Sequence, residues 1–160
     1  MIATSTSIRA EIEARLQADL SADGIDAFAA TIQGREVAVR VERFPDEPNE
    51  QQLSLLSSGA GAVLVRYLGS DYGKVEGGDQ DRMPMFECEI VTKSLAAEGG
   101  GLGAEELVEK VIERLQGYMP AGCWGAGEIR KDGFIDKIAG VWRHSVIVAF
   151  GAYGREGAFS

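Results

Sequence analysis

The chain has 160 residues, of which 45% are hydrophobic, so it can fold as one domain around a buried core. The chain contains 16 Lys and Arg residues and 25 Asp and Glu residues, which gives a formal net charge of −9 at pH 7. This charge excludes a module that holds a duplex through clustered basic side chains, and we expect no sequence-specific nucleic-acid partner. No apolar stretch approaches the roughly 18 residues of a membrane span, so no membrane partner is expected.

The first predicted element is an amphipathic helix. Apolar residues recur every four positions, which places them on one face of a helix. The hydroxyl groups of residues 4–7 can cap its start, and Asp23-Gly24 is typical of its end. The apolar positions are Ile8, Ile12, Leu16 and Leu20.

Strand patterns follow. Val37, Val39 and Val41 alternate with other residues, as in a half-buried strand, and Pro45 ends the pattern. Residues 62–65 are apolar at every position, which indicates a strand inside a sheet. The acidic, glycine-containing stretch from Asp71 to Arg82 predicts a long mobile loop.

The second half of the chain supplies two more strands and a second helix. Residues 86–91 alternate between apolar positions and the acids Glu87 and Glu89. A glycine-rich hinge, residues 99–103, precedes a helix from Ala104 to Gln116 with one apolar face. That face consists of Leu107, Val108, Val111, Ile112 and Leu115.

Near the C-terminus, Asp132-Gly133 between two apolar pairs predicts a tight hairpin. A last strand places alternate residues from Trp142 to Phe150 on one face, including His144. We therefore predict an α+β fold: a mostly antiparallel β-sheet packed by two main helices. Residues 1–160 form a single domain in this reading, with flexible ends at 1–5 and 151–160.

Few residues suggest catalysis or ligand binding. The glycines of residues 99–103 occupy the place of a phosphate loop, but the G-x-G-x-x-G spacing and a following Lys-Ser or Lys-Thr are missing. We interpret them as a hinge and expect no cofactor. The acids of the Asp71–Arg82 stretch lack the spacing of a calcium loop, and His144 has no second ligand nearby, so no metal site is predicted.

One arrangement could support an enzyme. Cys123 precedes Trp124, as in papain-like peptidases, and His144 could act as a base. The upstream Cys and the much more distant His of those enzymes are absent. A loop cysteine beside a partly buried Trp is the alternative that we favour, and the protein is expected not to be an enzyme.

The order of these elements resembles the Mu-like prophage tail-protein family, which belongs to contractile-tailed phages and related tail-like particles. The resemblance covers about residues 5–150. It includes the N-terminal helix, the short strand and turn of residues 39–45, and the strand leading into residues 69–73. It continues with Gln80 and Arg82, the strand from Phe86 to Thr92, and the helix from Leu107 to Leu115.

The resemblance implies a structural component of the virion tail or tail-like particle, assembled in the host cytoplasm. Its expected role, by analogy with tail terminators, is a homo-oligomeric ring, a hexamer, that caps the tube and joins it to the head or collar. Its partners would be its own copies, the tail tube, and sheath or head-completion proteins. A cysteine hydrolase using Cys123 and His144, and a transient tail-assembly chaperone, remain alternatives. The expected contact residues are Asp71, Tyr72, Gln80, Arg82, Tyr153 and Phe159.

Overall fold

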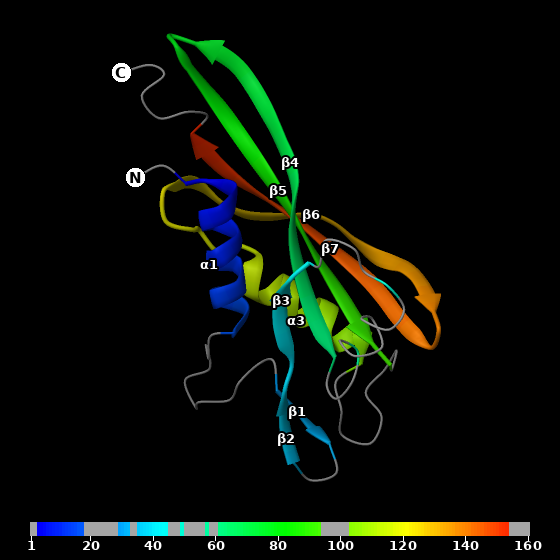
Figure 1. Ribbon diagram of the computed structural model, residues 1–160. Coiled ribbons are helices and arrows are strands. Elements are labelled where there is room, and N and C mark those ends of the chain that lie inside the picture. The colour runs from blue at the N-terminus through cyan, green and yellow to red at the C-terminus, as the bar shows by residue number, and fades with distance from the viewer. Residues whose placement is uncertain are drawn as a thin grey trace.

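The computed structural model describes residues 3–17, 29–32, 35–44, 49, 57, 61–93 and 103–153. It has the predicted α+β fold, with two helices and a five-stranded sheet in this part of the chain (Figure 1). The helices are α1 (Ser5–Gln17) and α3 (Ala104–Leu115). The strands are β1 (Ala29–Ile32), β2 (Arg35–Ala38), β3 (Arg40–Arg43), β4 (Ala62–Glu76), β5 (Asp79–Thr92), β6 (Cys123–Ile138) and β7 (Val141–Tyr153).

The large sheet has the strand order β3-β4-β5-β7-β6. Its neighbouring strands are antiparallel except for β3 and β4, which are parallel, so the prediction of a mostly antiparallel sheet is confirmed. β4 lies between β3 and β5, as its continuous apolar run predicted. β1 and β2 form a separate two-stranded antiparallel sheet.

Both helices cover one face of the large sheet. The stripe of α1 is confirmed: Ile8, Ile12 and Leu16 are fully buried, while Leu20 lies outside the described residues. The apolar side of α3 joins the same core, together with Val63, Phe86 and other sheet residues. α1 begins as expected, because the Ser7 amide donates to the Thr4 hydroxyl oxygen over 3.0 Å.

The end of α3 is fixed against β6. Gly117 has a φ of +79°, which suits the glycine that ends the helix. The Gly117 amide donates to the Gly127 carbonyl over 2.9 Å, and the Gly127 amide donates to the Tyr118 carbonyl over 2.7 Å. A Cβ atom at Gly127 would lie 2.2 Å from the Leu115 carbonyl oxygen, so only glycine fits this close approach.

The opposite face of the sheet holds the acids that alternate with the core residues of β5. Arg66 lies 2.6 Å from Glu87, and Arg143 lies 2.6 Å from Glu89. Arg143 also lies 2.8 Å from Asp136, so one guanidinium joins three strands, β5, β6 and β7. The predicted division of β5 into an apolar and an acidic face is therefore confirmed.

The prediction of a mobile loop between Asp71 and Arg82 is wrong. β4 continues to Glu76 and β5 starts at Asp79, with only Gly77 and Gly78 between them. Both glycines have positive φ, 59° and 89°, which suits the two-residue turn of a twisted hairpin. We call residues 68–84, the outer part of this hairpin, the arm. Figure 1 shows it extending beyond the helices.

Three further differences concern the boundaries of helices and strands. β6 runs through Asp132-Gly133, and the turn lies instead at Ala139 and Gly140, both of positive φ. The strand expected across residues 37–42 is interrupted at Val39. At the expected flexible ends, Ser5 already belongs to α1 and residues 151–153 belong to β7.

β6 forms one edge of the sheet and is irregular along its length. Its pairing with β7 shifts register at four places between Cys123 and Asp136. Bulges of this kind twist an edge strand and disrupt the row of backbone groups that another strand could pair with. Lys131 and Lys137 also lie on this strand, and charged side chains further disfavour strand addition.

Candidate assembly surface and acidic groove

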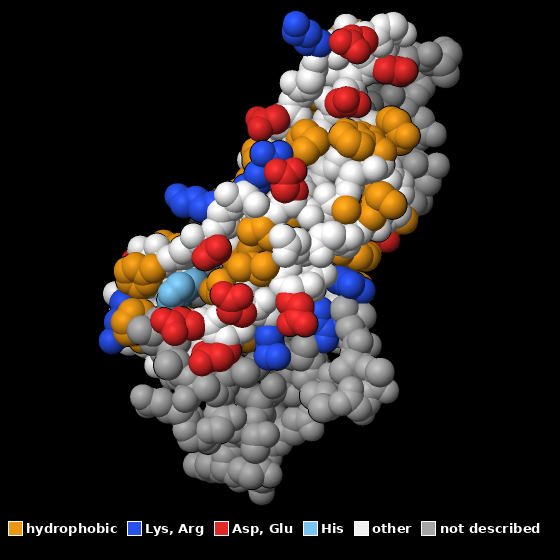
Figure 2. Space-filling view, turned by 180° about the vertical axis from the view of Figure 1, so that it is seen from behind, with side chains coloured by type: hydrophobic (Ala, Val, Ile, Leu, Met, Phe, Trp, Pro, Cys, Tyr) orange, Lys and Arg blue, Asp and Glu red, His pale blue; other side chains and the backbone are white. Residues whose placement is uncertain are grey.

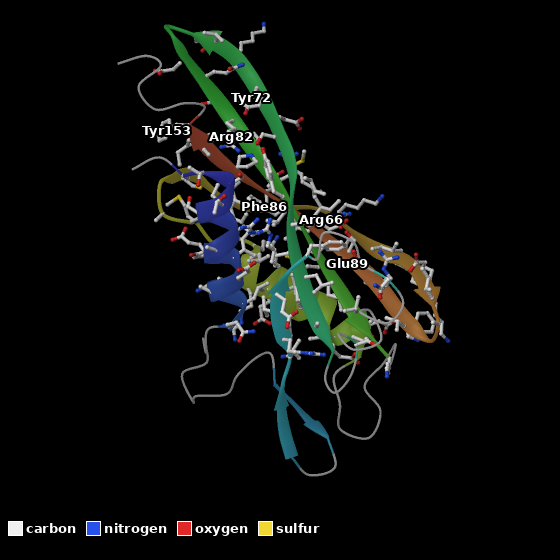
Figure 3. All side chains as sticks on the ribbon, viewed as in Figure 1. Arg66, Tyr72, Arg82, Phe86, Glu89 and Tyr153 are labelled. Atoms are coloured by element: carbon white, nitrogen blue, oxygen red, sulfur yellow. The ribbon has the colours of Figure 1, made fainter. Side chains whose placement is uncertain are left out.

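The arm brings together residues that are far apart in the sequence. Tyr72 on β4 is paired with Arg82 on β5, and Arg82 is paired with Ala152 on β7. Asp81 is paired with Tyr153. The side chains of Tyr72 and Tyr153 are 56% and 58% exposed. Five of the six predicted contact residues thus lie on the adjacent strands β4, β5 and β7, and Figure 3 labels three of them near the outer end of the molecule.

Arg82 is held in place by residues of the arm and its base. Its Nε donates to the Ser70 hydroxyl over 2.9 Å, and its Nη2 donates to the Tyr67 hydroxyl over 3.1 Å. The Tyr67 and Ser70 hydroxyls lie 2.6 Å apart. Burial raises the pKa of Tyr67, but the hydrogen bonds from Ser70 and Arg82 and the Arg82 charge outweigh it, so the net shift is downward.

Two further predicted contact residues, Gln80 and Asp71, also belong to the arm. Gln80 stiffens the arm, because its side-chain amide donates to the Gly73 carbonyl over 2.8 Å. Asp71 is exposed and is paired with Met83. Phe159 lies outside the described residues.

Sequence reasoning missed exposed apolar side chains next to these residues. Val75 near the arm tip is 61% exposed, and Trp124 at the start of β6 is 45% exposed. The Trp124 indole N–H donates to the Ala152 carbonyl over 3.0 Å. Its ring covers Gly151, where a Cβ atom would lie 2.8 Å from the ring. The small residue opposite the large ring was the available signal, but the pairing of β6 with β7 was needed to recognise it.

The structure does not bring Cys123 and His144 together. Cys123 is the first residue of β6, not a loop residue, and it is paired with Ala152. Ala152 lies eight positions beyond His144 on β7, or about 26 Å at about 3.3 Å per residue. A nucleophile and its base need hydrogen-bond contact, so this pair cannot act as a catalytic dyad in this conformation.

The pKa shifts of the two thiols also argue against a reactive cysteine. Burial raises the pKa of Cys123 to about 11, and the Glu11 carboxylate adds to this effect. Burial raises the pKa of Cys88 to about 12. A reactive cysteine needs the thiolate form near neutral pH, whereas both environments favour the thiol.

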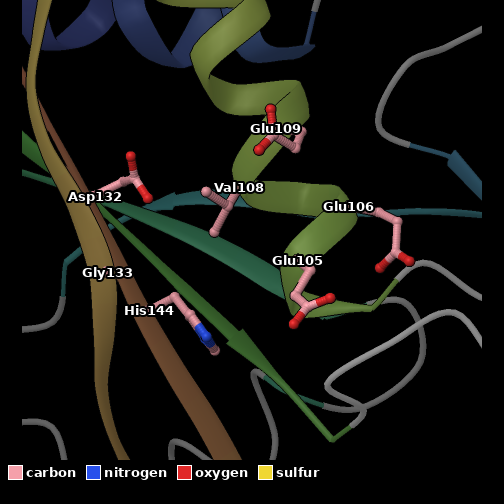
Figure 4. A pocket seen from close by; sticks show the side chains of 7 residues that line it. All are labelled: Glu105, Glu106, Val108, Glu109, Asp132, Gly133 and His144. Atoms are coloured by element: carbon pink, nitrogen blue, oxygen red, sulfur yellow. The ribbon is translucent and has the colours of Figure 1, made fainter.

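A groove of about 500 Å³ lies between α3 and the strands β6 and β7. It is lined by four acidic residues, Glu105, Glu106, Glu109 and Asp132, together with Val108, Gly133 and His144 (Figure 4). We call it the acidic groove. Figure 2 shows red acidic side chains around the pale blue histidine on this side of the molecule.

His144 is the buried polar residue of this groove. Its side chain is 8% exposed, and its ring meets that of Phe134 edge to face with centroids 5.5 Å apart. Its Nδ1 has no hydrogen-bond partner. Burial lowers the pKa of His144, and the opposing effect of the Glu105 charge is smaller. The imidazole is therefore held in its neutral form near pH 7.

Other kinds of site are not found in the described ranges. No group of three or more His, Cys, Asp or Glu residues there is placed to hold a metal ion. No helix in those ranges is long and apolar enough to cross a membrane. Most of the glycine-rich hinge lies outside the described residues, so its interpretation stays a prediction.

Comparisons with known proteins give a family and a fold. The Gp37 protein family matches residues 29–153. A chain in the solved structure of the virion of the native gene transfer agent particle is similar, with a TM-score of 0.56 at 12% sequence identity. The similarity covers 95% of this chain and 98% of that chain. No match was found among curated proteins.

Proposed function

The chain belongs to the Gp37 protein family, and we propose that it is a structural protein of a phage tail or a tail-like particle. The supporting observation is the likeness to a chain from a gene transfer agent virion, which extends over nearly the whole length of both chains. A likeness of this extent means that the entire fold, and not one common motif, is shared with a particle component.

We further propose that the protein acts as a tail terminator in a contractile tail. In this role copies contact one another head to tail, and such contacts close into a ring when the rotation between neighbours allows it. The ring caps the tube and connects it to the head or collar. The expected occupants of the two ring faces are the tail tube and head-completion proteins.

The arm and the adjoining end of β7 are the contact surface that this proposal uses. Tyr72, Val75 and Tyr153 present exposed apolar area, and aromatic side chains are enriched where proteins meet. The arm extends past the helices, so it can reach a neighbouring subunit while the core stays intact (Figure 1). The bulged edge of β6 is disfavoured as a contact, because its backbone groups do not form a regular row.

The charge of the chain also suits a position on the path of DNA. Its formal net charge of −9 repels phosphates, so DNA can pass near the ring without being held there. Such a ring would not hold DNA and would not distinguish one DNA sequence from another.

The proposal is tested in purified particles. The protein should be found by mass spectrometry in intact particles, and labelled antibody fragments should locate it at one end of the tail in electron micrographs. Its presence during assembly but absence from finished particles would instead favour a tail-assembly chaperone and overturn the terminator proposal.

Variants of the arm make the test specific. The double substitution Tyr72→Ser with Tyr153→Ser should leave the fold intact but abolish incorporation into tails, which should then vary in length or lack heads. Ile135→Ser is a matched control, because Ile135 is 39% exposed and lies on β6 away from the arm. Normal particles from the arm variant would contradict the proposed contact surface.

A further inference from the structure

In the part of the chain that the structure describes, the acidic groove contains carboxylates without a basic partner and a buried histidine nitrogen without a hydrogen-bond partner. Glu105, Glu109 and Asp132 place three carboxylates around one space, from α3 and from β6. Among the described residues, no Lys or Arg forms an ion pair with any of the three. Glu106 differs from them, because its carboxylate accepts a hydrogen bond from the Gly103 amide over 3.1 Å and caps α3.

His144 provides a second and independent feature. More than nine-tenths of its surface is buried, yet its Nδ1 has no hydrogen-bond partner. Figure 4 shows this side chain projecting from β7 into the groove, beside Glu105 and Val108. A buried polar atom without a partner costs free energy, and this cost is recovered when a ligand supplies the missing hydrogen bond.

We propose that the acidic groove binds the side chain of an arginine or lysine from a partner protein of the particle. The carboxylates of Glu105, Glu109 and Asp132 supply the negative charge that attracts the cation. Nδ1 of neutral His144 is closed off from the groove in this structure, so a turn of the imidazole ring is needed before it accepts a hydrogen bond from the N–H groups of the cation. Val108 packs against the aliphatic stem of the bound side chain. Only the identity of the partner rests on the proposed function; the chemistry of the groove does not.

The charge of the chain favours a different protein over a second copy as the partner. The arm, which the proposed ring places against a neighbouring copy, has more acids than bases, so it does not complement the charge of the groove. A basic segment of another protein gains attraction from the whole surface and from the groove. The groove thus selects the chemistry of its partner, and the arm supplies apolar contact area elsewhere.

The single histidine of the chain gives a direct measurement. The ¹⁵N-edited NMR spectrum of the imidazole contains signals from this one residue. N-acetyl-arginine methylamide and N-acetyl-lysine methylamide should each shift the Nδ1 signal to a saturable end point at pH 7. N-acetyl-citrulline methylamide has nearly the shape of the arginine probe without its charge and should produce no shift. Equal shifts with citrulline, or none with either cation, overturn the proposal.

Charge variants separate the groove from the general acidity of the protein. Glu109→Gln and Asp132→Asn should each weaken binding of the arginine probe by about two- to fivefold, and the double variant should weaken it further. Glu113→Gln removes the same charge from an exposed position of α3 outside the groove, and it should leave the affinity unchanged. Equal weakening in Glu113→Gln overturns the site.

The partner is identified in assembled particles. A carbodiimide joins a carboxylate to a nearby amine without a spacer, so Glu105, Glu109 or Asp132 should be cross-linked to a lysine of another particle protein. Cross-links from these three residues to a second copy of this chain overturn the partner assignment. If the protein is absent from particles, the proposed function fails, while the probe titration still decides whether the groove binds cations.

Discussion

The inner and outer halves of the β4–β5 pair are one continuous hairpin in two different environments. In the inner half, Val63, Val65, Phe86 and Cys88 are fully buried beneath the two helices. In the outer half, most side chains from Leu68 to Gln80 are exposed or only partly buried. The comparison shows that backbone pairing and a few side-chain hydrogen bonds maintain the arm, whereas buried side-chain packing maintains the body. Stability and assembly can therefore be changed separately.

The largest expected difference is between an inner and an outer aromatic residue. Phe86→Ala should lower the free energy of unfolding by about 3–5 kcal/mol, because the ring is fully buried and packs edge to face on Phe150. Tyr72→Ala on the arm should change it by less than about 0.5 kcal/mol. Urea denaturation measures both values, and similar losses would contradict the division.

The second prediction concerns the acids on the same two halves. Glu89→Gln should cost about 3 kcal/mol, because Glu89 is 1% exposed and removing its charge leaves Arg143 with only Asp136. Glu76→Gln, at the exposed end of β4, is the matched control and should have almost no effect. Chemical denaturation of both variants at pH 7 would show whether burial makes the difference.

The third prediction compares the two thiols. A rise in the pKa of Cys123 from its ordinary value of 9.0 to about 11 reduces its thiolate fraction at pH 8 by about a hundredfold. Alkylation of Cys123 by iodoacetamide should be slower than that of a free thiol by a similar factor. Cys88, fully buried in the body, should react only when the sheet opens. Mass spectrometry of timed samples would resolve the two rates, and rapid labelling of native Cys123 would reopen the hydrolase alternative.

The smallest predicted effect comes from His144. Burial lowers its pKa in the folded state, so the unfolded chain binds a proton at a higher pH than the folded chain does. Stability attributable to this residue should be constant above pH 6.5 and fall as the pH decreases toward the folded-state pKa. The difference in unfolding free energy between the native protein and His144→Gln, measured from pH 8 to pH 5, isolates this effect. A constant difference would contradict it.

Local periodicity was sufficient to predict the two helices and the inner parts of β4, β5 and β7. The spacing of apolar residues in α1 and α3, and the alternation of apolar and acidic residues in β5, indicate which side of each element is buried. The arm was mistaken for a loop because its acids and glycines are typical of loops, while its strand structure depends on pairing between β4 and β5. At Asp132-Gly133 a strong turn signal was overridden, because pairing with β7 holds both residues in β6.

The candidate sites were only partly predictable for a related reason. Tyr72 and Arg82 were selected from one segment, and Tyr153 from another, but sequence spacing gave no sign that β5 joins them. The acidic groove was missed because Glu109 and His144 belong to an α-helix and a strand that meet only in the folded chain. The burial of His144 and its unpartnered Nδ1 were likewise not visible in the sequence, because both depend on how β7 packs against α3 and β6.

The irregular outer edge of β6 affects how free subunits behave before they join an assembly. Many newly made copies must coexist at high local concentration without forming fibres, and a regular edge strand would act as a template for stacking them. Four shifts of register along one strand remove that template. At this edge, strand-to-strand stacking of separate subunits is therefore disfavoured, and contacts between them are left to side chains elsewhere on the surface.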